Sequence, residues 1–193
     1  MRRAVILHGT DGSPDELEWQ GWLKYLLEEG GYEVYFPKLP HSHTPNLKVY
    51  NKFLLDSGWD FSDNVLVGHS SGATTLLYLL QQEWFPSVRA IILVGVFLNE
   101  RLLIAAPWYV PGQFDDLFVE EFDIAKIKQK SDKFYLVHGD DDPYCDYIEA
   151  KELCKKLDGK FITASEAGHL GRAANIAELP ELAKCLKIDE ILN

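Results

Sequence analysis

The sequence predicts an α/β fold, a three-layer α/β/α sandwich around a mostly parallel six-stranded sheet. Short apolar runs alternate with amphipathic helical stretches along the chain, and the runs are apolar on both faces. Strands of this kind are buried on both sides by helices. The 193 residues, 47% of them hydrophobic, suffice for one substantial core and contain no linker-like stretch, so we expect a single domain spanning residues 1–193.

The first half of the chain contains three strand-helix pairs. A β-rich run at residues 3–7 precedes a helix in which apolar residues recur close to helical spacing, namely Leu17, Trp19, Leu23, Leu26 and Leu27. Gly30 and Gly31 end this helix. The expected strands are residues 3–7, 32–36 and 64–67, and the expected helices are residues 17–29, 47–55 and 73–82.

The second half repeats the alternation without an internal repeat in sequence. Its expected strands are residues 90–96, 134–138 and 160–163, and its expected helices are residues 122–129, 146–157 and 179–192. Because the carboxyl ends of parallel strands meet at one edge of a sheet, we expect the functional loops there.

The most informative segment follows the third strand and reads Gly68-His69-Ser70-Ser71-Gly72. Between a strand and a helix, glycine-x-serine-x-glycine forms a sharp turn that exposes the central serine in a strained conformation. Side chains at the two glycines would collide with neighbouring backbone. The pattern predicts a nucleophilic Ser70, although an ordinary tight turn could have the same five residues.

Acidic residues and a histidine occupy two later strand ends. Asp140, Asp141 and Asp142 follow the fifth strand, and Gly168 and His169 follow the sixth. The resulting order is Ser, Asp, His. A serine hydroxyl is a poor nucleophile until a base accepts its proton, and an acid must orient that base. We therefore expect His169 to be the base, the alternative being a loop histidine that bonds to backbone.

These motifs together resemble the α/β-hydrolases over nearly the whole chain. The segments that carry the resemblance are HGTDGSP, GHSSG, HGDDDP and AGHLG. More narrowly, the small size, Trp19 and Trp22 in the first helix, the FPKLPHSHTP loop and GHSSGA are similar to small serine hydrolases of the retinoblastoma-binding-protein-9 and YdeN family. The resemblance implies a compact α/β-hydrolase fold without a cap domain, with Ser70, Asp142 and His169 as catalytic residues.

The choice among the three adjacent aspartates depends on two arguments. Pro143 restricts Asp142 to an extended conformation, and the family pattern places the acid immediately before this proline. Asp140 and Asp141 remain alternatives. The run could also be a solvated turn that caps the next helix, or a Mg²⁺ site, but the further oxygen ligands that a metal needs are not evident.

An oxyanion hole is expected from two backbone amides. Ser71 follows the nucleophile and can direct its N–H at a developing oxyanion. The family resemblance implies that the second donor is Thr10, which follows His8-Gly9 at the end of the first strand.

Other aromatic and histidine residues have less certain roles. We expect His69 to pack behind the turn. His41 and His43 would suit a metal only with a third ligand, and we place His41 at the rim of a substrate pocket. The segment at residues 97–118, which contains Trp108, either packs against the sheet or forms a small hydrophobic lid that selects an acyl or aromatic group.

Composition excludes several classes of protein. The formal net charge of −11 disfavours nucleic acid and anionic membranes as partners. Three cysteines without CxxC spacing favour reduced thiols over disulfides or a zinc cage. Residues 4–7 are too short an apolar run for a signal sequence or a membrane span, so we expect a cytoplasmic protein without metal or organic cofactor.

The sequence therefore predicts a serine hydrolase that cleaves a small ester or thioester, in the manner of a carboxylesterase. The same residues would also serve an acyltransferase or a C–C hydrolase. The alternative from another class is a hydrolase-fold protein-interaction module with weak or no catalysis. Retinoblastoma binding has been suggested within the resembling family, but the sequence contains no LxCxE motif.

Overall fold

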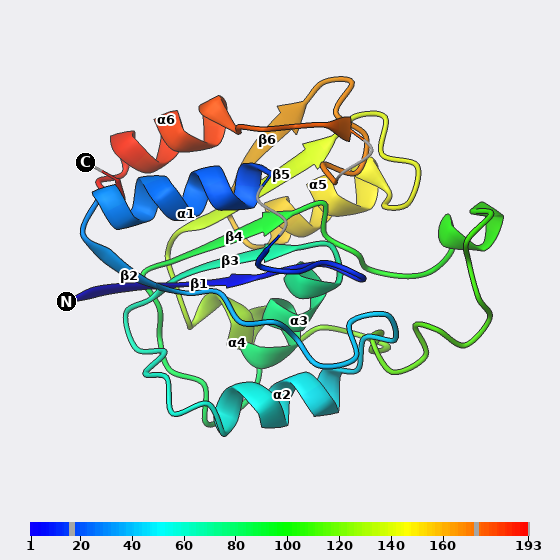
Figure 1. Cartoon of the computed structure of the whole chain (residues 1–193), viewed down its shortest axis with the longest axis horizontal. Coiled ribbons are helices and arrows are strands. Elements are labelled where there is room, and N and C mark those ends of the chain that lie inside the picture. Colours follow the sequence, from blue (N-terminus) through cyan, green and yellow to red (C-terminus); the bar gives the residue numbers. More distant parts are fainter. Residues whose placement is uncertain (16–17, 172–173, 193) are drawn as a thin grey trace.

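The computed structural model describes residues 1–15, 18–171 and 174–192, and a six-stranded sheet runs through its centre (Figure 1). The strand order is β2-β1-β3-β4-β5-β6, and every neighbouring pair is parallel. The predicted α/β sandwich is confirmed. The strands are β1 (Arg2–Leu7), β2 (Tyr32–Tyr35), β3 (Val65–His69), β4 (Ala90–Val94), β5 (Phe134–Gly139) and β6 (Lys160–Ala164).

Helices follow the strands in the expected order. They are α1 (Trp19–Glu29), α2 (Leu47–Leu55), α3 (Ser71–Leu79), α4 (Ile124–Lys128), α5 (Tyr147–Lys156) and α6 (Pro180–Ile188), with a short 3₁₀ helix η1 (Leu103–Ala105) that the sequence pattern did not predict. Leu17, expected in the first helix, lies outside the described residues. Within the described part of the chain, no helix has the length and apolar character needed to cross a membrane.

The two faces of the sheet are covered by different helices. Along β1, Ala4 and Ile6 pack with α1 and α6, while Val5 and Leu7 pack with α2, α3 and α5. This alternation follows from the strand, whose successive side chains point to opposite faces. Figure 1 shows α1 and α6 on one side of the sheet and α2 and α3 on the other. The four central strands, β1, β3, β4 and β5, are buried along most of their length, as their apolar sequences predict.

Several element boundaries differ from the sequence prediction, among them those of helices α4 and α6 and of strand β4. Helix α4 has only five residues, because Asp123 accepts a hydrogen bond from the Lys126 amide and so begins the helix at Ile124. Helix α6 ends at Ile188 rather than near residue 192. Strand β4 ends at Val94 because Gly95, at φ +53°, turns the chain out of the sheet.

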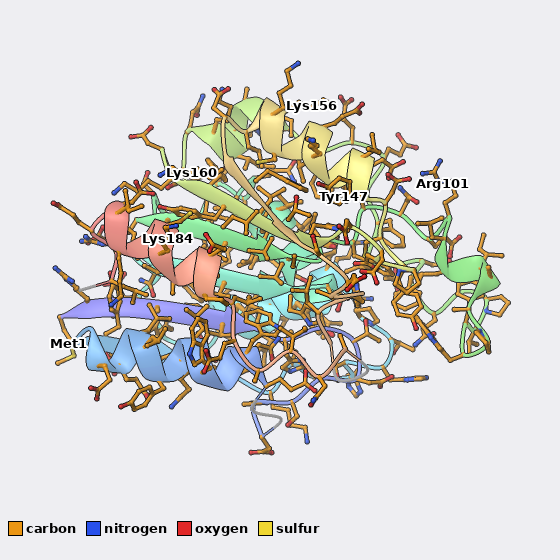
Figure 2. The ribbon with its side chains drawn as sticks, turned by 90° about the horizontal axis from the view of Figure 1, so that it is seen from above. Met1, Arg101, Tyr147, Lys156, Lys160 and Lys184 are labelled. Atoms are coloured by element: carbon orange, nitrogen blue, oxygen red, sulfur yellow. The ribbon has the colours of Figure 1, made fainter. Side chains whose placement is uncertain are left out.

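The segment from residue 95 to residue 123 projects from the body of the molecule (Figure 1). Seen from above, Arg101 on this segment lies at the opposite end of the molecule from Met1 (Figure 2). Arg101 pairs with Asp146 at 2.6 Å and with Glu149 at 3.0 Å, which ties the segment to α5. Its inner side chains form a separate apolar cluster that includes Phe97, Leu103, Phe114 and Leu117.

Glycine is required where α3 begins. A Cβ atom at Gly72 would lie 2.4 Å from the Leu7 carbonyl oxygen and 2.6 Å from that of His8. Both obstacles are backbone atoms of β1 and the following loop, so a side chain could not be accommodated by rotation. The strand and helix therefore approach each other as closely as the sequence motif predicts.

We expect Gly72→Ala to lower the free energy of unfolding by at least about 2 kcal/mol, because the added methyl group forces β1 and α3 apart. Urea denaturation would measure the change. Gly171→Ala is the matched control, since the nearest atom to its new Cβ is 3.8 Å away, and its effect should stay within about 0.5 kcal/mol. Equal stabilities of the two variants would contradict the prediction.

Candidate active site

Ser70 sits at the turn between β3 and α3 in a conformation that few residues adopt. Its backbone has φ +55° and ψ −124°, and its amide donates to the Val94 carbonyl at 2.9 Å. For a residue with a side chain, this conformation costs about 1–3 kcal/mol. The surrounding glycines permit it: a Cβ at Gly68 would lie 2.6 Å from the Cα of Ala73. The strained turn predicted from the sequence is present.

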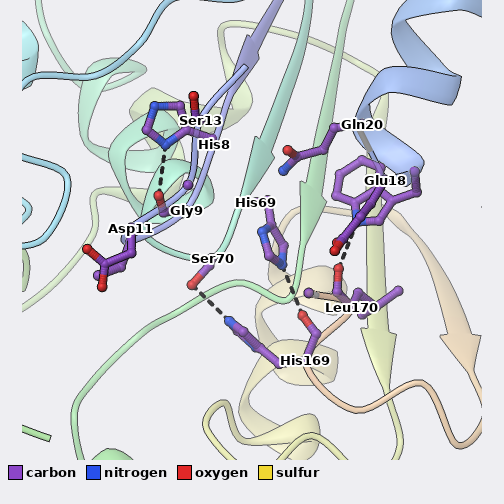
Figure 3. Close-up of a pocket in the computed structure, with 14 residues that line it drawn as sticks. His8, Gly9, Asp11, Ser13, Glu18, Gln20, His69, Ser70, His169 and Leu170 are labelled. Atoms are coloured by element: carbon purple, nitrogen blue, oxygen red, sulfur yellow. Dashed lines mark hydrogen bonds between the residues drawn. The ribbon is translucent and has the colours of Figure 1, made fainter. Parts of the chain in front are cut away.

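Ser70, His169 and Asp142 form a continuous hydrogen-bonded chain. Ser70 Oγ lies 2.8 Å from His169 Nε2, a contact drawn in Figure 3, and His169 Nδ1 lies 2.8 Å from Asp142 Oδ2. Because a carboxylate accepts, Nδ1 carries the imidazole proton and Nε2 has the lone pair that faces the serine hydroxyl. The structure thus brings together the three side chains that the sequence placed on separate loops.

Asp142 is the aspartate that reaches the imidazole. Its side chain is fully buried, and its Oδ1 atom accepts from the Tyr144 amide at 2.9 Å and the Cys145 amide at 3.0 Å. Burial raises the pKa of this carboxyl, but the hydrogen bond and electrostatic attraction of His169, the hydrogen bond from the Tyr144 amide and the attraction of His138 outweigh burial and hold the pKa below its usual range. Asp142 therefore stays ionised at neutral pH.

Asp140 and Asp141, the alternatives left open by the sequence, contact backbone instead. Asp140 Oδ1 accepts from the Glu166 amide at 2.9 Å, and Asp141 Oδ1 accepts from the Gly168 amide at 2.7 Å. Both side chains are exposed. Neither bonds to the imidazole of His169 within the described residues, so geometry favours Asp142 as the orienting acid.

Two backbone amides lie free beside Ser70. Neither the Thr10 amide nor the Ser71 amide has an acceptor in the part of the chain that the structure describes. The Thr10 hydroxyl donates to Ser71 Oγ at 3.1 Å, which joins the loop after β1 to the start of α3. Gly9 allows this approach, because a Cβ there would lie 2.9 Å from Ser70 Cβ. The two amides predicted as oxyanion donors therefore have no competing acceptor among the described residues.

His69 supports the site from behind without touching Ser70 Oγ. Its Nε2 atom donates to the His169 carbonyl at 2.9 Å, and its ring meets Trp19 edge-on at a centroid distance of 5.7 Å. Burial lowers the pKa of His69 to about 3, with the nearby His169 as the next cause, so the ring is neutral. This is the packing position expected from the sequence.

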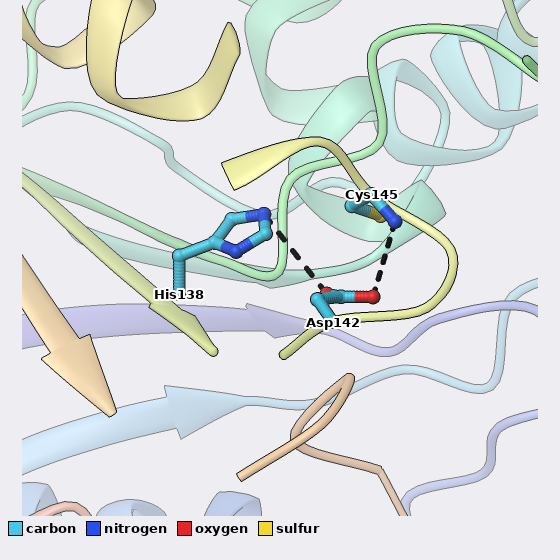
Figure 4. Close-up of side chains that lie close together, drawn as sticks. All are labelled: His138, Asp142 and Cys145. Carbon is cyan, nitrogen blue, oxygen red and sulfur yellow. Dashed lines mark hydrogen bonds and ion pairs between the residues drawn. The ribbon is translucent and has the colours of Figure 1, made fainter. Parts of the chain in front are cut away.

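A second histidine, His138, lies close to Asp142. His138, Asp142 and Cys145 bring their ligand-type atoms within 4.8 Å of one another (Figure 4). His138 Nε2 lies 3.9 Å from Asp142 Oδ2 and has no hydrogen-bond partner in the described structure. Burial raises the pKa of the Cys145 thiol well above its usual range, which keeps it protonated and a poor metal ligand.

Two cavities meet at Ser70 and share Thr10, Asp11 and His169. One, of about 230 Å³ and drawn in Figure 3, runs between the loop after β1 and the start of α1. The other, of about 210 Å³, has mainly aromatic and aliphatic walls, formed by Phe97, Leu103, Trp108, Phe114 and Tyr144.

The two pocket residues suggested by the sequence lie in different settings. Trp108, 44% exposed, lines the aromatic cavity and donates from Nε1 to the Tyr144 hydroxyl at 3.3 Å. His41 is exposed and is not among the residues that line either cavity at Ser70. Its neighbour His43 reaches the site indirectly, because its Nδ1 atom lies 3.0 Å from Asp11 Oδ1. The expected rim position of His41 is therefore not seen.

The comparison with protein families agrees with this geometry. The model of the serine hydrolase family matches residues 4–188. The chain belongs to the serine hydrolase family. The match contains β1 from Ala4 onward and the five other strands completely, and the loops at Ser70, Asp142 and His169 lie within it.

Individual relatives in the family and fold cover almost the entire chain. The chain is 25% identical to the serine hydrolase RBBP9 of Rattus norvegicus, over 96% of this chain and 94% of the relative. Its fold is similar to that of the ydeN gene product of B. subtilis, with a TM-score of 0.84, 22% identity and 97% of each chain covered. Est1E of Butyrivibrio proteoclasticus, solved with ferulic acid bound, has a TM-score of 0.66 at 16% identity and covers 99% of this chain and 88% of its own. The resemblance inferred from the motifs is confirmed.

The sequence did not reveal the other walls of the aromatic cavity. Phe97, Leu103 and Phe114 come from the projecting segment, and Tyr144 comes from the loop after β5. The only signal was the density of aromatic residues between β4 and α4. Tyr144 could have been suspected from its position two residues after Asp142.

The buried His69 predicts a particular dependence of stability on pH. Between pH 6.5 and about 3 the unfolded chain binds a proton at this residue and the native state does not. Stability is therefore complete above pH 6.5 and falls as pH decreases, by up to about 1.4 kcal/mol per pH unit from this group. His69→Gln, whose amide can still donate to His169, should flatten that slope in urea unfolding measured at several pH values. An unchanged slope would show that His69 is protonated in the native state.

Proposed function

We propose that this serine hydrolase cleaves a small ester or thioester through an acyl-enzyme on Ser70. The observation that carries the proposal is the unbroken chain of two 2.8 Å hydrogen bonds from Ser70 through His169 to the buried Asp142. Beside the same hydroxyl, the amides of Thr10 and Ser71 have no acceptor among the residues that the structure describes. Together these groups supply a nucleophile, a base, an orienting acid and an oxyanion hole.

In the first half of the reaction, Ser70 Oγ attacks the carbonyl carbon while His169 Nε2 accepts the hydroxyl proton. The imidazolium that forms is stabilised by the ionised Asp142, which itself stays unprotonated. The carbonyl oxygen becomes an oxyanion and accepts from the amides of Thr10 and Ser71. His169 then gives its proton to the leaving alcohol or thiol as the bond to the carbonyl carbon breaks.

In the second half, water takes the place of the leaving group. His169 accepts a proton from water as its oxygen attacks the acyl carbon, and the oxyanion again forms between Thr10 and Ser71. Collapse of this intermediate returns the proton to Ser70 and releases the acid. Each loss of one oxyanion donor typically lowers turnover about 100- to 1,000-fold, so the two amides matter as much as the base.

The aromatic cavity supports an acyl group with an aromatic ring or a short branched chain. Its volume of about 210 Å³ and its ring of aromatic side chains suit a compact apolar group. Est1E, a fold relative, binds ferulic acid, an aromatic acid. We therefore assign Trp108 and Tyr144 to substrate selection.

Labelling with a fluorophosphonate probe, followed by mass-spectrometric mapping, tests the proposed nucleophile. We expect the probe to modify Ser70, and we expect Ser70→Ala to lower p-nitrophenyl ester turnover by at least about 1,000-fold, because the residual oxyanion hole and base cannot form an acyl-enzyme. Ser62→Ala, which removes an exposed serine from another loop, is the control. Full activity in the Ser70 variant would refute the proposal.

Removal of the indole of Trp108 tests the acyl pocket. Because an aromatic pair contributes about 0.5–1.5 kcal/mol, we expect Trp108→Ala to lower kcat/KM about three- to tenfold for a benzoate ester relative to an acetate ester. Ile104→Ala, an exposed apolar residue of the same segment that does not line the cavity, should leave this ratio unchanged. An unchanged ratio in the tryptophan variant would place the acyl group elsewhere.

A further inference from the structure

The loop that carries His169 has an unusual backbone. Glu166, Gly168 and Leu170 all have left-handed conformations, with φ of +55°, +51° and +52°. For residues with a side chain, this region costs about 1–2 kcal/mol each. Two of the three residues are not glycine, so the local sequence does not itself favour this conformation, and contacts with the rest of the protein must impose it.

Two side-chain N–H groups, one at the end of β3 and one at the start of α1, donate hydrogen bonds to backbone carbonyls of this loop. His69 Nε2 donates to the carbonyl of His169 at 2.9 Å, and Trp19 Nε1 donates to the carbonyl of Leu170 at 2.8 Å. Both donors are buried, and their rings pack edge-on against each other. These two hydrogen bonds hold the carbonyl groups of two consecutive residues, His169 and Leu170, in place.

Two carboxylates hold the same loop from the side of β5. Asp140 accepts from the amide of Glu166, and Asp141 accepts from the amide of Gly168 at 2.7 Å. A hydrogen bond to an ionised acceptor is stronger than one between neutral groups. The Asp141 bond lies one residue before His169 and is the nearer of the two.

The end of β5 and this loop are in direct contact. A Cβ at Gly139 would lie 2.0 Å from the Gly168 carbonyl oxygen, so only glycine allows the two backbones to meet. The three aspartates that follow Gly139 then engage successive parts of the loop. Asp140 and Asp141 bond to its backbone, and Asp142 bonds to the imidazole.

We propose that Asp141 is a positioning residue for the reaction, acting through the Gly168 amide to set the imidazole of His169 between Ser70 and Asp142. The inference rests on the proposed function, since it assigns His169 the role of base. Both imidazole nitrogens make 2.8 Å contacts, so a shift of the loop lengthens at least one of them. A misplacement of about 1 Å can cost about 100-fold in rate.

The test compares Asp141→Ala with Asp141→Asn. The alanine variant loses the acceptor, and we expect its kcat for a p-nitrophenyl ester to fall about 10- to 100-fold while KM stays within about twofold. The asparagine variant keeps an oxygen that can accept from Gly168, and its kcat should return to within about threefold of the wild-type value. The rate of fluorophosphonate labelling at Ser70 should follow the same order.

Asp123→Ala is the matched control. Asp123 is also an exposed aspartate that accepts from a backbone amide, that of Lys126, but it lies at α4, away from the loop of His169. It should retain wild-type kcat. Thermal unfolding of all variants sets a temperature at which each is folded, so that rates are compared between native proteins.

Two results would overturn the positioning role. A kcat of Asp141→Ala within twofold of the wild type would show that the hydrogen bond has no effect on the base. Equal losses in the alanine and asparagine variants would show that the charge, not the acceptor, is responsible. Failure of the proposed function has a different signature, namely unlabelled Ser70 in the wild-type protein.

Discussion

The strained backbone of Ser70 is the constraint on which the site depends. Its left-handed φ, between a buried strand and a buried helix, places Ser70 at the two cavities and leaves the Ser71 amide without an acceptor among the described residues. Only glycines at positions 68 and 72 let β1, β3 and α3 pack closely enough to impose this turn. Apolar side chains buried on both faces of the sheet stabilise the fold and fix the position of the turn. This stabilisation offsets the conformational cost of the strained Ser70 backbone.

The parallel sheet then determines which loops meet. Ser70 and His169 are 99 residues apart, yet they bond because β3 and β6 end at the same edge. The intervening β5 supplies Asp142 in the same way. The loop of His169 is held by side chains from α1, from the end of β3 and from the loop after β5, namely Trp19, His69, Asp140 and Asp141. The geometry of the base is thus a property of the whole fold.

The projecting segment between β4 and α4 lies within the part of the chain that matches the serine hydrolase family. The family match covers residues 4–188, and the ydeN product shares the fold at a TM-score of 0.84. In the projecting segment between β4 and α4, Phe97 and Phe114 are buried and also line the aromatic cavity, together with the more exposed Trp108. Packing of this segment is therefore compatible with its proposed role in substrate selection, because the same side chains serve the cluster and the cavity wall.

The sequence by itself determined the order of strands and helices and the Ser70 turn, because periodicity and glycine spacing are local properties. It predicted His169 and Asp142 from the order of the motifs, the proline after Asp142 and the family resemblance, and left Asp140 and Asp141 as alternatives. It did not determine the five-residue length of α4, the exposed place of His41, or the backbone bonds of Asp140 and Asp141. Those depend on which distant groups a side chain meets. Three adjacent aspartates have the same chemistry, and only the approach of the His169 loop to β5 gives each a different partner.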